Sequence, residues 1–299
     1  MDNRNNLKAW LYLAPALILL AIFMIYPLID VFTYSFEENY SFLSPRTGIG
    51  LGNYIYVLKD ANFLNAIKNT VIVVIITVPL STIIAILIAV GLNSIKILKR
   101  FFQTIFFLPY VTNTIAVGMV FMVMFNKVDN NQLGLINNIF KLFGLDPIDF
   151  ISSEGPYAAK MFALCSLIIW NVMPFKVIVL IGALQGVKKE MYNAAKIDGA
   201  SRLTTFRKVT IPMISPMISY LVITGFIGAF KQYNEAVALF GTDLNGAGMN
   251  TMVGYIYETL YGVGGFPSYA SAAAIVLFSI VLTITIINMI ISSKKVYYS

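Results

Sequence analysis

Six apolar segments, each long enough to cross a membrane as a helix, constrain this chain more than any other feature. They cover residues 10–35, 70–92, 101–125, 161–185, 217–240 and 269–292. The first would be about 39 Å long as a helix, which exceeds a bilayer core of about 30 Å. Because a signal peptide has a shorter apolar region, we expect this first helix to be retained. The sequence therefore predicts an all-α membrane protein with six transmembrane helices.

The composition agrees with a membrane protein and argues against an enzyme. Charged residues make up 12% of the 299 residues, about half of the share found in soluble domains. The chain has no histidine, and its single cysteine, Cys165, lies in an apolar segment where an inert buried thiol is expected. The sequence shows no phosphate-binding P-loop, carboxylate pair or metal cluster. We therefore predict no enzyme activity, no metal site and no cofactor bound by this chain.

The charges in the loops predict the orientation of the helices. With the N-terminus in the cytoplasm, the inner segments hold 13 of the 21 basic residues, and the outer segments (36–69, 126–160 and 241–268) hold six. Cytoplasmic loops carry an excess of Lys and Arg, so both termini are predicted to be cytoplasmic. Because the net charge of +7 falls in short loops, it does not indicate a nucleic-acid partner. The sequence shows no internal repeat, which counts against a secondary transporter.

The longest inner loop, residues 188–216, is basic and has the composition of a helix. One interpretation is an interfacial helix that lies on anionic lipid. A second interpretation is a docking surface for a protein partner. The small residues favour it, because they would let the partner's surface approach closely; they are Ala194, Ala195, Gly199 and Ala200. Ser201 is a candidate N-cap for a second short helix that runs toward residue 207.

A polar cluster in the fifth apolar segment is the main candidate for a ligand site. Lys231 and Glu235 are four residues apart and are predicted to share one helix face, with Asn234 beside them. Charged residues at membrane depth often mark a pathway. The rings of Phe230 and Tyr233 next to these polar groups would suit a polyhydroxylated ligand. The alternative is a Lys–Glu pair that only neutralises itself or packs against a partner subunit.

Weaker candidates lie in two other segments. They are Trp170, Asn171 and Lys176 in the fourth segment, and Tyr110 and Asn113 in the third. Residues of these types in membrane helices more often serve helix packing or a subunit interface than a ligand site.

The stretch NAAKIDGASRLTTFRKVTIPMISP resembles the EAA-type cytoplasmic loop of ABC importer permeases, which has the pattern E-A-A, then a Gly, then a hydrophobic–x–Pro ending. Asn193 stands where the pattern has Glu, and Gly246-Ala247-Gly248 stands where the family usually shows Gly-Gly-Pro. WLYLAPALILLAIFMIYPLIDVFTYSF looks like the first helix of maltose-type, MalF-like carbohydrate permeases. The residues that match the loop pattern are Ala194, Ala195, Asp198, Gly199, Ala200, Phe206, Ile211, Pro212 and Pro216.

This resemblance implies a MetI/MalF-like permease fold in a single transmembrane domain (1–299). It has a first helix (10–35) and a five-helix core (67–292) that contains the coupling loop (188–216). The loop would seat on an ATP-binding subunit through Tyr192, Asn193, Ala194, Ala195, Asp198, Gly199, Ala200 and Arg202. The resemblance also implies that residues 230–235 contribute sugar contacts.

The implied assembly is an importer in a bacterial cell membrane. Its other parts would be a second, related permease chain, two ATP-binding subunits that hold ATP and Mg, and an extracytoplasmic binding protein that delivers a sugar or oligosaccharide. An importer of another polar solute, such as glycerol-3-phosphate, stays open as an alternative. A stand-alone channel or secondary transporter is the alternative from a different class.

Overall fold

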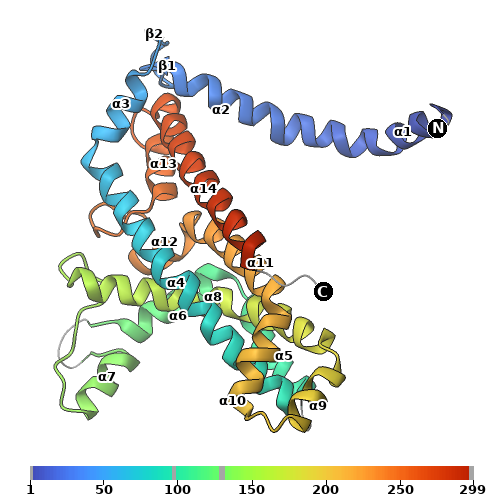
Figure 1. The fold of residues 1–299 in the computed structure, drawn as a ribbon. Coiled ribbons are helices and arrows are strands. Elements are labelled where there is room, and N and C mark those ends of the chain that lie inside the picture. Colours follow the sequence, from blue (N-terminus) through green and yellow to red (C-terminus); the bar gives the residue numbers. More distant parts are fainter. Residues whose placement is uncertain (1–2, 96–98, 128–131, 296–299) are drawn as a thin grey trace. The chain divides into compact units, whose positions relative to one another are not determined.

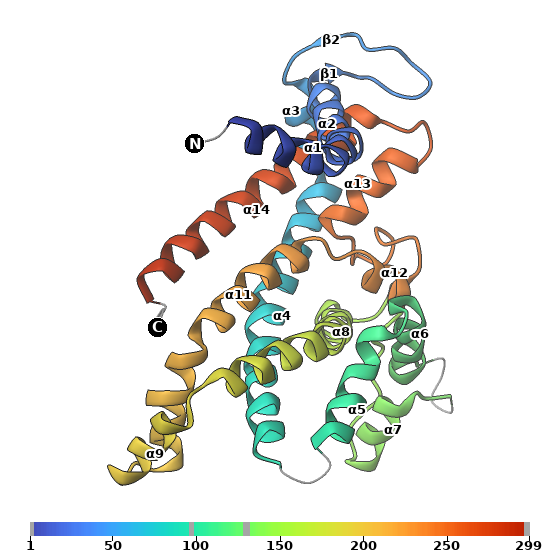
Figure 2. The same ribbon diagram turned by 90° about the vertical axis from the view of Figure 1, so that its right-hand side faces the viewer.

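In a computed structural model, the chain is built almost entirely of helices (Figures 1 and 2). The structure describes residues 3–95, 99–127 and 132–295. Lys96, one of the inner basic residues counted for the orientation, lies outside the described residues. The chain forms two compact units, one from the residues up to Leu64 with Gly254–Ser279, and the other from Asn65–Val253 with the residues from Ile280 on. Helices α4 (Ala61–Ser94) and α14 (Pro267–Lys295) contribute residues to both units.

The first unit contains the N-terminal helix, a pair of short strands and two short helices. The helix comprises α1 (Asn3–Leu20), a π-helical turn η1 (Ala21–Ile25) and α2 (Tyr26–Phe36). Strands β1 (Glu37–Glu38) and β2 (Gly48–Ile49) pair antiparallel, and α3 (Gly52–Lys59) and most of α13 (Met252–Tyr261) belong to the same unit. The buried Asn53 amide donates to the carbonyls of Ser35 and Glu37, both at 3.0 Å, and so ties α3 to the end of α2.

The second unit contains the remaining helices, and α8 (Tyr157–Gly186) is the most enclosed of its membrane-length helices. Half of the apolar window of α8 is buried, because its near-continuous apolar sequence offers a packing surface to neighbours on several sides. The other helices are α5 (Lys99–Val111), α6 (Thr114–Phe125), α7 (Leu135–Leu142), α9 (Lys189–Ile197), α10 (Arg202–Thr205), η2 (Phe206–Thr210), α11 (Ile211–Phe230) and α12 (Asn234–Phe240).

The number of spans agrees with the sequence prediction when one broken helix is counted as a span. Five helices of the described chain are long and apolar enough to cross a membrane. The predicted third span, 101–125, is instead a pair of helices bent by 101° between α5 and α6. Asn113 causes the restart, because its side-chain oxygen accepts from the backbone N–H of Ile115 at 2.8 Å and caps α6. Six spans result if the bent pair is one of them.

The fifth predicted span, 217–240, has wrong boundaries at both ends. The helix begins at Arg202, runs without a break through η2 and α11, and ends at Phe230. The chain leaves the helix at Lys231, and a new helix, α12, begins at Asn234. The prediction that Lys231 and Glu235 share one helix face is therefore wrong. A run of consecutive polar residues follows Phe230, and a continuous helix would have pointed some of them at apolar neighbours.

Candidate functional site

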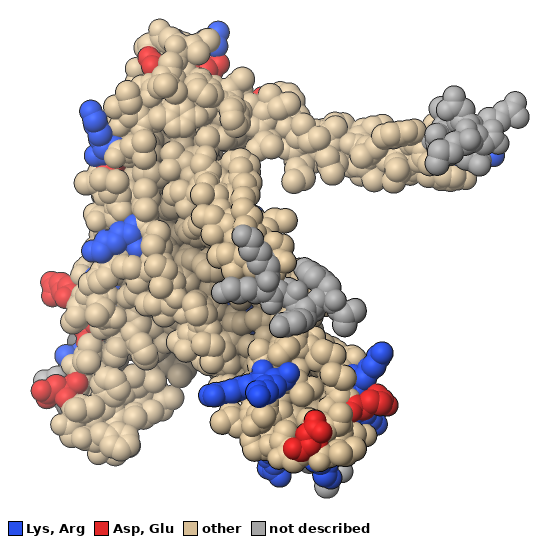
Figure 3. Space-filling view, in the orientation of Figure 1, with Lys and Arg blue, Asp and Glu red and all other residues tan. Residues whose placement is uncertain are grey.

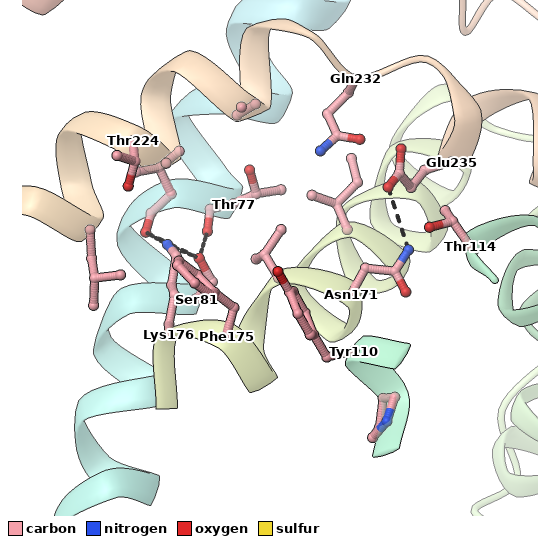
Figure 4. Close-up of a pocket in the computed structure, with 18 of the residues that line it drawn as sticks. Thr77, Ser81, Tyr110, Thr114, Asn171, Phe175, Lys176, Thr224, Gln232 and Glu235 are labelled. Atoms are coloured by element: carbon pink, nitrogen blue, oxygen red, sulfur yellow. Dashed lines mark hydrogen bonds between the residues drawn. The ribbon is translucent and has the colours of Figure 1, made fainter. Parts of the chain in front are cut away.

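A cavity with both polar and apolar lining residues lies in the second unit, between membrane-length segments of the chain (Figure 4). Its volume is about 320 Å³, within the range of small-molecule sites. Helices α4, α5, α6, α8 and α11 form its walls, and the segment between α11 and α12 closes one end. The lining residues are Thr77, Val78, Ser81, Pro109, Tyr110, Thr112, Thr114, Ile168, Asn171, Val172, Phe175, Lys176, Leu221, Thr224, Gly225, Gly228, Ala229, Gln232 and Glu235.

Most of the polar groups in the cavity are hydroxyls and side-chain amides. Thr77 adds a buried hydroxyl oxygen that has no hydrogen-bond partner among the described residues. The rings of Tyr110 and Phe175 stack with their centroids 5.8 Å apart and supply an apolar face. A cavity of this kind can hold a ligand that combines flat apolar faces with many hydroxyl groups.

Glu235 forms the acidic end of the cavity. The amide of Asn171, on α8, donates to its Oε1 at 3.4 Å (Figure 4). With its nitrogen turned toward the carboxylate, the amide of Gln232 donates to both Glu235 oxygens. Two amides therefore orient this carboxylate, and no cationic side chain of the described residues pairs with it.

Lys176 forms the basic end of the cavity. The residue is 4% exposed, and its ammonium donates to Ser81 Oγ at 2.7 Å and to Thr82 Oγ1 at 2.9 Å on α4 (Figure 4). Both hydroxyls donate their own protons to carbonyls one turn earlier in α4, so they can only accept from the lysine. Among the described residues, only neutral oxygens therefore accept hydrogen bonds from this buried ammonium group.

A second site of interest is the loop between α8 and α11, which folds as two helices with a tight turn. Helix α9 ends in a Schellman motif: the N–H of Ala200 donates to the carbonyl of Ala195 at 2.9 Å, and the N–H of Gly199 to that of Lys196 at 3.1 Å. Gly199 has φ of +68°, which the motif requires and glycine adopts without strain. Ser201 then caps α10 by accepting from the N–H of Thr204 at 3.2 Å, so the predicted cap is confirmed.

The surface of this loop carries both charge and apolar side chains. Figure 3 shows Lys, Arg and acidic side chains gathered at the end of the unit that carries α9 and α10. Ile197 at the end of α9 is 86% exposed, and Leu203 on α10 is 58% exposed. The helix that Ser201 caps begins at Arg202 and is longer than the predicted short helix, because it continues through η2 into α11.

Comparison with known proteins decides the family. The family described as "Binding-protein-dependent transport system inner membrane component" matches residues 81–295. This chain belongs to that family. It is 31% identical to the arabinooligosaccharides transport system permease protein AraP of Bacillus subtilis, over 95% of this chain and 88% of the relative. It is 31% identical to the lactose transport system permease protein LacF of Rhizobium radiobacter, over 96% of each chain.

The fold is also that of a solved importer. A chain from the crystal structure of a bacterial ABC transporter involved in the import of the acidic polysaccharide alginate matches with a TM-score of 0.81. The identity is 22%, and the match covers 97% of this chain and 96% of that chain. The resemblance found in the sequence is therefore confirmed: the protein is a multi-pass membrane subunit of a binding-protein-dependent ABC transport system.

Four of the permease's candidate site residues line the cavity. They are Asn171 and Lys176 on α8, Tyr110 on α5, and Glu235 at the start of α12. Tyr110 and Lys176 were weak candidates in the sequence, and the helix packing brings them together with Glu235.

The other candidates in the permease lie elsewhere. Lys231 and Asn234 are exposed and outside the cavity lining, and Phe230 is buried in helix packing. Tyr233 packs against the hydrophobic core around α8. The ring centroids of Trp170 and Phe121 lie 6.2 Å apart. Asn113 caps α6.

Sequence reasoning missed several lining residues of the permease, above all Thr77, Ser81, Thr224 and Gln232. A signal for two of them was present: Thr77 and Ser81 are polar, four residues apart, and lie within an otherwise apolar membrane segment.

The eight residues expected to contact an ATP-binding subunit lie in α9, in the turn that follows it and at the first residue of α10. Ala195 is buried under α9, and Tyr192 is half-buried, with its hydroxyl accepting from Thr210 at 3.4 Å. Ala200 is half-buried within the turn. The remaining five are exposed: Asn193, Ala194, Asp198, Gly199 and Arg202.

Proposed function

We propose that this permease carries a sugar or an oligosaccharide across the membrane through the cavity that Figure 4 shows. The observation that carries the proposal is the lining of the cavity, in which hydroxyls and amides surround a stacked pair of rings. Relatives named for arabinooligosaccharides and for lactose support a carbohydrate substrate.

The unpaired hydroxyl of Thr77 supports a polyhydroxylated ligand. A buried hydroxyl oxygen without a partner costs about 1–3 kcal/mol, and a sugar hydroxyl that donates to it would remove that cost. Glu235 can accept from two further hydroxyls, because its carboxylate has more acceptor positions than its two amide neighbours use. The ring faces of Tyr110 and Phe175 would cover the apolar face of a sugar ring.

We further propose that the α9–α10 turn docks on a cytoplasmic ATP-binding subunit, so that both termini are cytoplasmic. The exposed Ile197 and Leu203 would enter an apolar groove, and the exposed basic residues around them would contact its acidic rim. ATP and Mg would be held by two such subunits and none by this chain. A second, related permease and an extracytoplasmic binding protein would complete the importer.

The first test is purification of the chain in mild detergent from its native membrane. We expect a P-loop ATPase and a second multi-pass permease to co-purify in stoichiometric amounts, and mass spectrometry would identify them. A homo-oligomer without any ATPase would contradict the proposal.

The second test concerns Glu235, for which the neighbouring Asn234 offers a matched control. Glu235→Gln keeps the shape of the side chain but removes a charged acceptor, so we expect the apparent KM for the transported sugar to rise by about tenfold or more. Asn234→Gln changes an exposed residue outside the cavity and should leave uptake unchanged. Uptake of the labelled sugar in cells that express the whole importer measures both. An unchanged KM in Glu235→Gln would remove Glu235 from the binding site.

A further inference from the structure

We propose that the cavity selects sugars that carry an anionic substituent and that Lys176 is the residue that recognises it. This inference rests on the proposed function, since it names the class of sugar for the same cavity. It is carried by the position of Lys176 and by the groups that surround its ammonium.

Lys176 is a buried cation without a carboxylate partner in the described chain. The residue is 4% exposed, and its hydrogen-bond acceptors are Ser81 Oγ, Thr82 Oγ1 and, at 3.4 Å, the carbonyl of Val78. Within the described residues, the one ion pair joins Arg46 to Glu37, in the other unit. Neutral oxygens can orient an ammonium group but leave its charge uncompensated.

An uncompensated cation is costly in this environment. Burial away from water penalises the charged form of a lysine, and the penalty is recovered when an anion pairs with it at close range. The hydroxyls of Ser81 and Thr82 cannot supply that anion, and their own protons are given to backbone carbonyls. An acidic ligand would supply it.

Lys176 also lies at the wall of the cavity. Both Lys176 and Gly225 line the cavity, and a Cβ atom on Gly225 would lie 3.4 Å from the lysine Nζ. Glycine at this position of α11 leaves the space beside the ammonium free of a side chain. The bond to the Val78 carbonyl is long at 3.4 Å, so this N–H can turn to a ligand at little cost.

Glu235 does not cancel the charge of Lys176. The two groups form no ion pair in the described chain, and each is held by its own polar neighbours. On α8, Asn171, which binds Glu235, precedes Lys176 by five residues, or about 7.5 Å along the helix axis. The cavity thus has an acidic end and a basic end with room for the ligand between them. Ring hydroxyls would donate to Glu235, and the anionic substituent would face Lys176.

The experiment uses pairs of oligosaccharides that differ only at C6, such as digalacturonate and galactobiose, with a C6-phosphorylated sugar as a third probe. Binding to the purified importer is measured by titration calorimetry. The binding protein is left out, so that its own sugar preference does not contribute to the measured affinity. We expect the acidic member to bind about tenfold or more tightly than the neutral one. The phosphorylated probe separates selection of a carboxylate from selection of any anion.

Three variants complete the test. Lys176→Met should abolish the preference by weakening only the acidic sugar, and Lys176→Arg should keep it. Lys231→Met removes the same charge from an exposed residue outside the cavity and should change nothing. Equal binding of both sugars to the unmodified importer, or an equal loss of both in Lys176→Met, would overturn the inference while sugar transport stands. If neither sugar binds and a polar solute that is not a sugar does, the proposed function itself fails.

Discussion

Replacing Gly199 with valine is expected to reduce ATP-driven uptake by at least about tenfold while the amount of permease in the membrane stays the same. Gly199 has φ of +68° and closes the Schellman motif that ends α9. A β-branched residue in this conformation is strained by about 1–3 kcal/mol, so we expect the last turn of α9 to unwind. The exposed Ile197 at that turn would then move out of the proposed docking surface. Uptake and ATPase activity of the reconstituted importer measure the loss.

Gly199→Asn is the matched control for this prediction. Asparagine also has a side chain, but it adopts the left-handed conformation more readily than other residues. Within the described chain, a Cβ atom on Gly199 would meet nothing within 4 Å. Gly199→Asn should therefore keep most of the uptake. If it fails as completely as Gly199→Val, the dihedral explanation is wrong and a partner must approach the glycine too closely for any side chain.

The long apolar segments and the α9–α10 turn could be predicted because local sequence determines them. A membrane-length apolar run must form a helix, since its backbone groups have no other partners in lipid. The positions of Gly199 and Ser201 follow from helix-end chemistry that involves only nearby residues. Helices were therefore confirmed at all six apolar segments and Ser201 as the cap of α10, although the third segment is bent into two helices and the fifth begins and ends elsewhere than predicted.

The break after Phe230 could not be predicted, because it depends on packing between helices that are distant in sequence. The stretch 217–240 contains no proline or glycine after Gly228, so the sequence favours one continuous helix. Residues 231–235 also contain no clear cap signal that would end it. In the structure, the break turns Gln232 and Glu235 toward Asn171 on α8. Lys231 is left exposed by the same break.

The basic end of the cavity was missed for a related reason. Lys176 appeared alone in an apolar segment, and its acceptors on α4 are more than ninety residues away in the sequence. Thr77 and Ser81 gave a local signal as polar residues within a span, but one helix face alone does not show which helix it meets. The cavity needs the packing of α4, α8 and α11, and that packing is a tertiary property.

Gly118→Ala is expected to disrupt the acidic end of the cavity from a distance. Helices α6 and α12 lie next to each other (Figure 2), and a Cβ atom on Gly118 would overlap the Cβ of Ala238. Overpacking of this kind costs about 1–3 kcal/mol, and the shift of α12 would move Glu235 away from Asn171. We expect a lower melting temperature and a higher KM for the transported sugar, measured by thermal unfolding in detergent and by uptake.

Ala238→Gly on the facing helix should rescue this variant, because it removes the atom that the new methyl group meets. The nearest remaining atoms, Ala238 Cα and Leu167 Cδ2, would lie at 3.4 and 3.5 Å, which are ordinary packing distances. The double variant should then regain both stability and sugar affinity, although Ala238→Gly alone costs about 1 kcal/mol as a glycine inside a helix. If the loss of a methyl group at residue 238 repairs the damage done by the added methyl group at residue 118, the two helices are in contact at these positions. Additive damage would show that α6 and α12 do not set the position of Glu235.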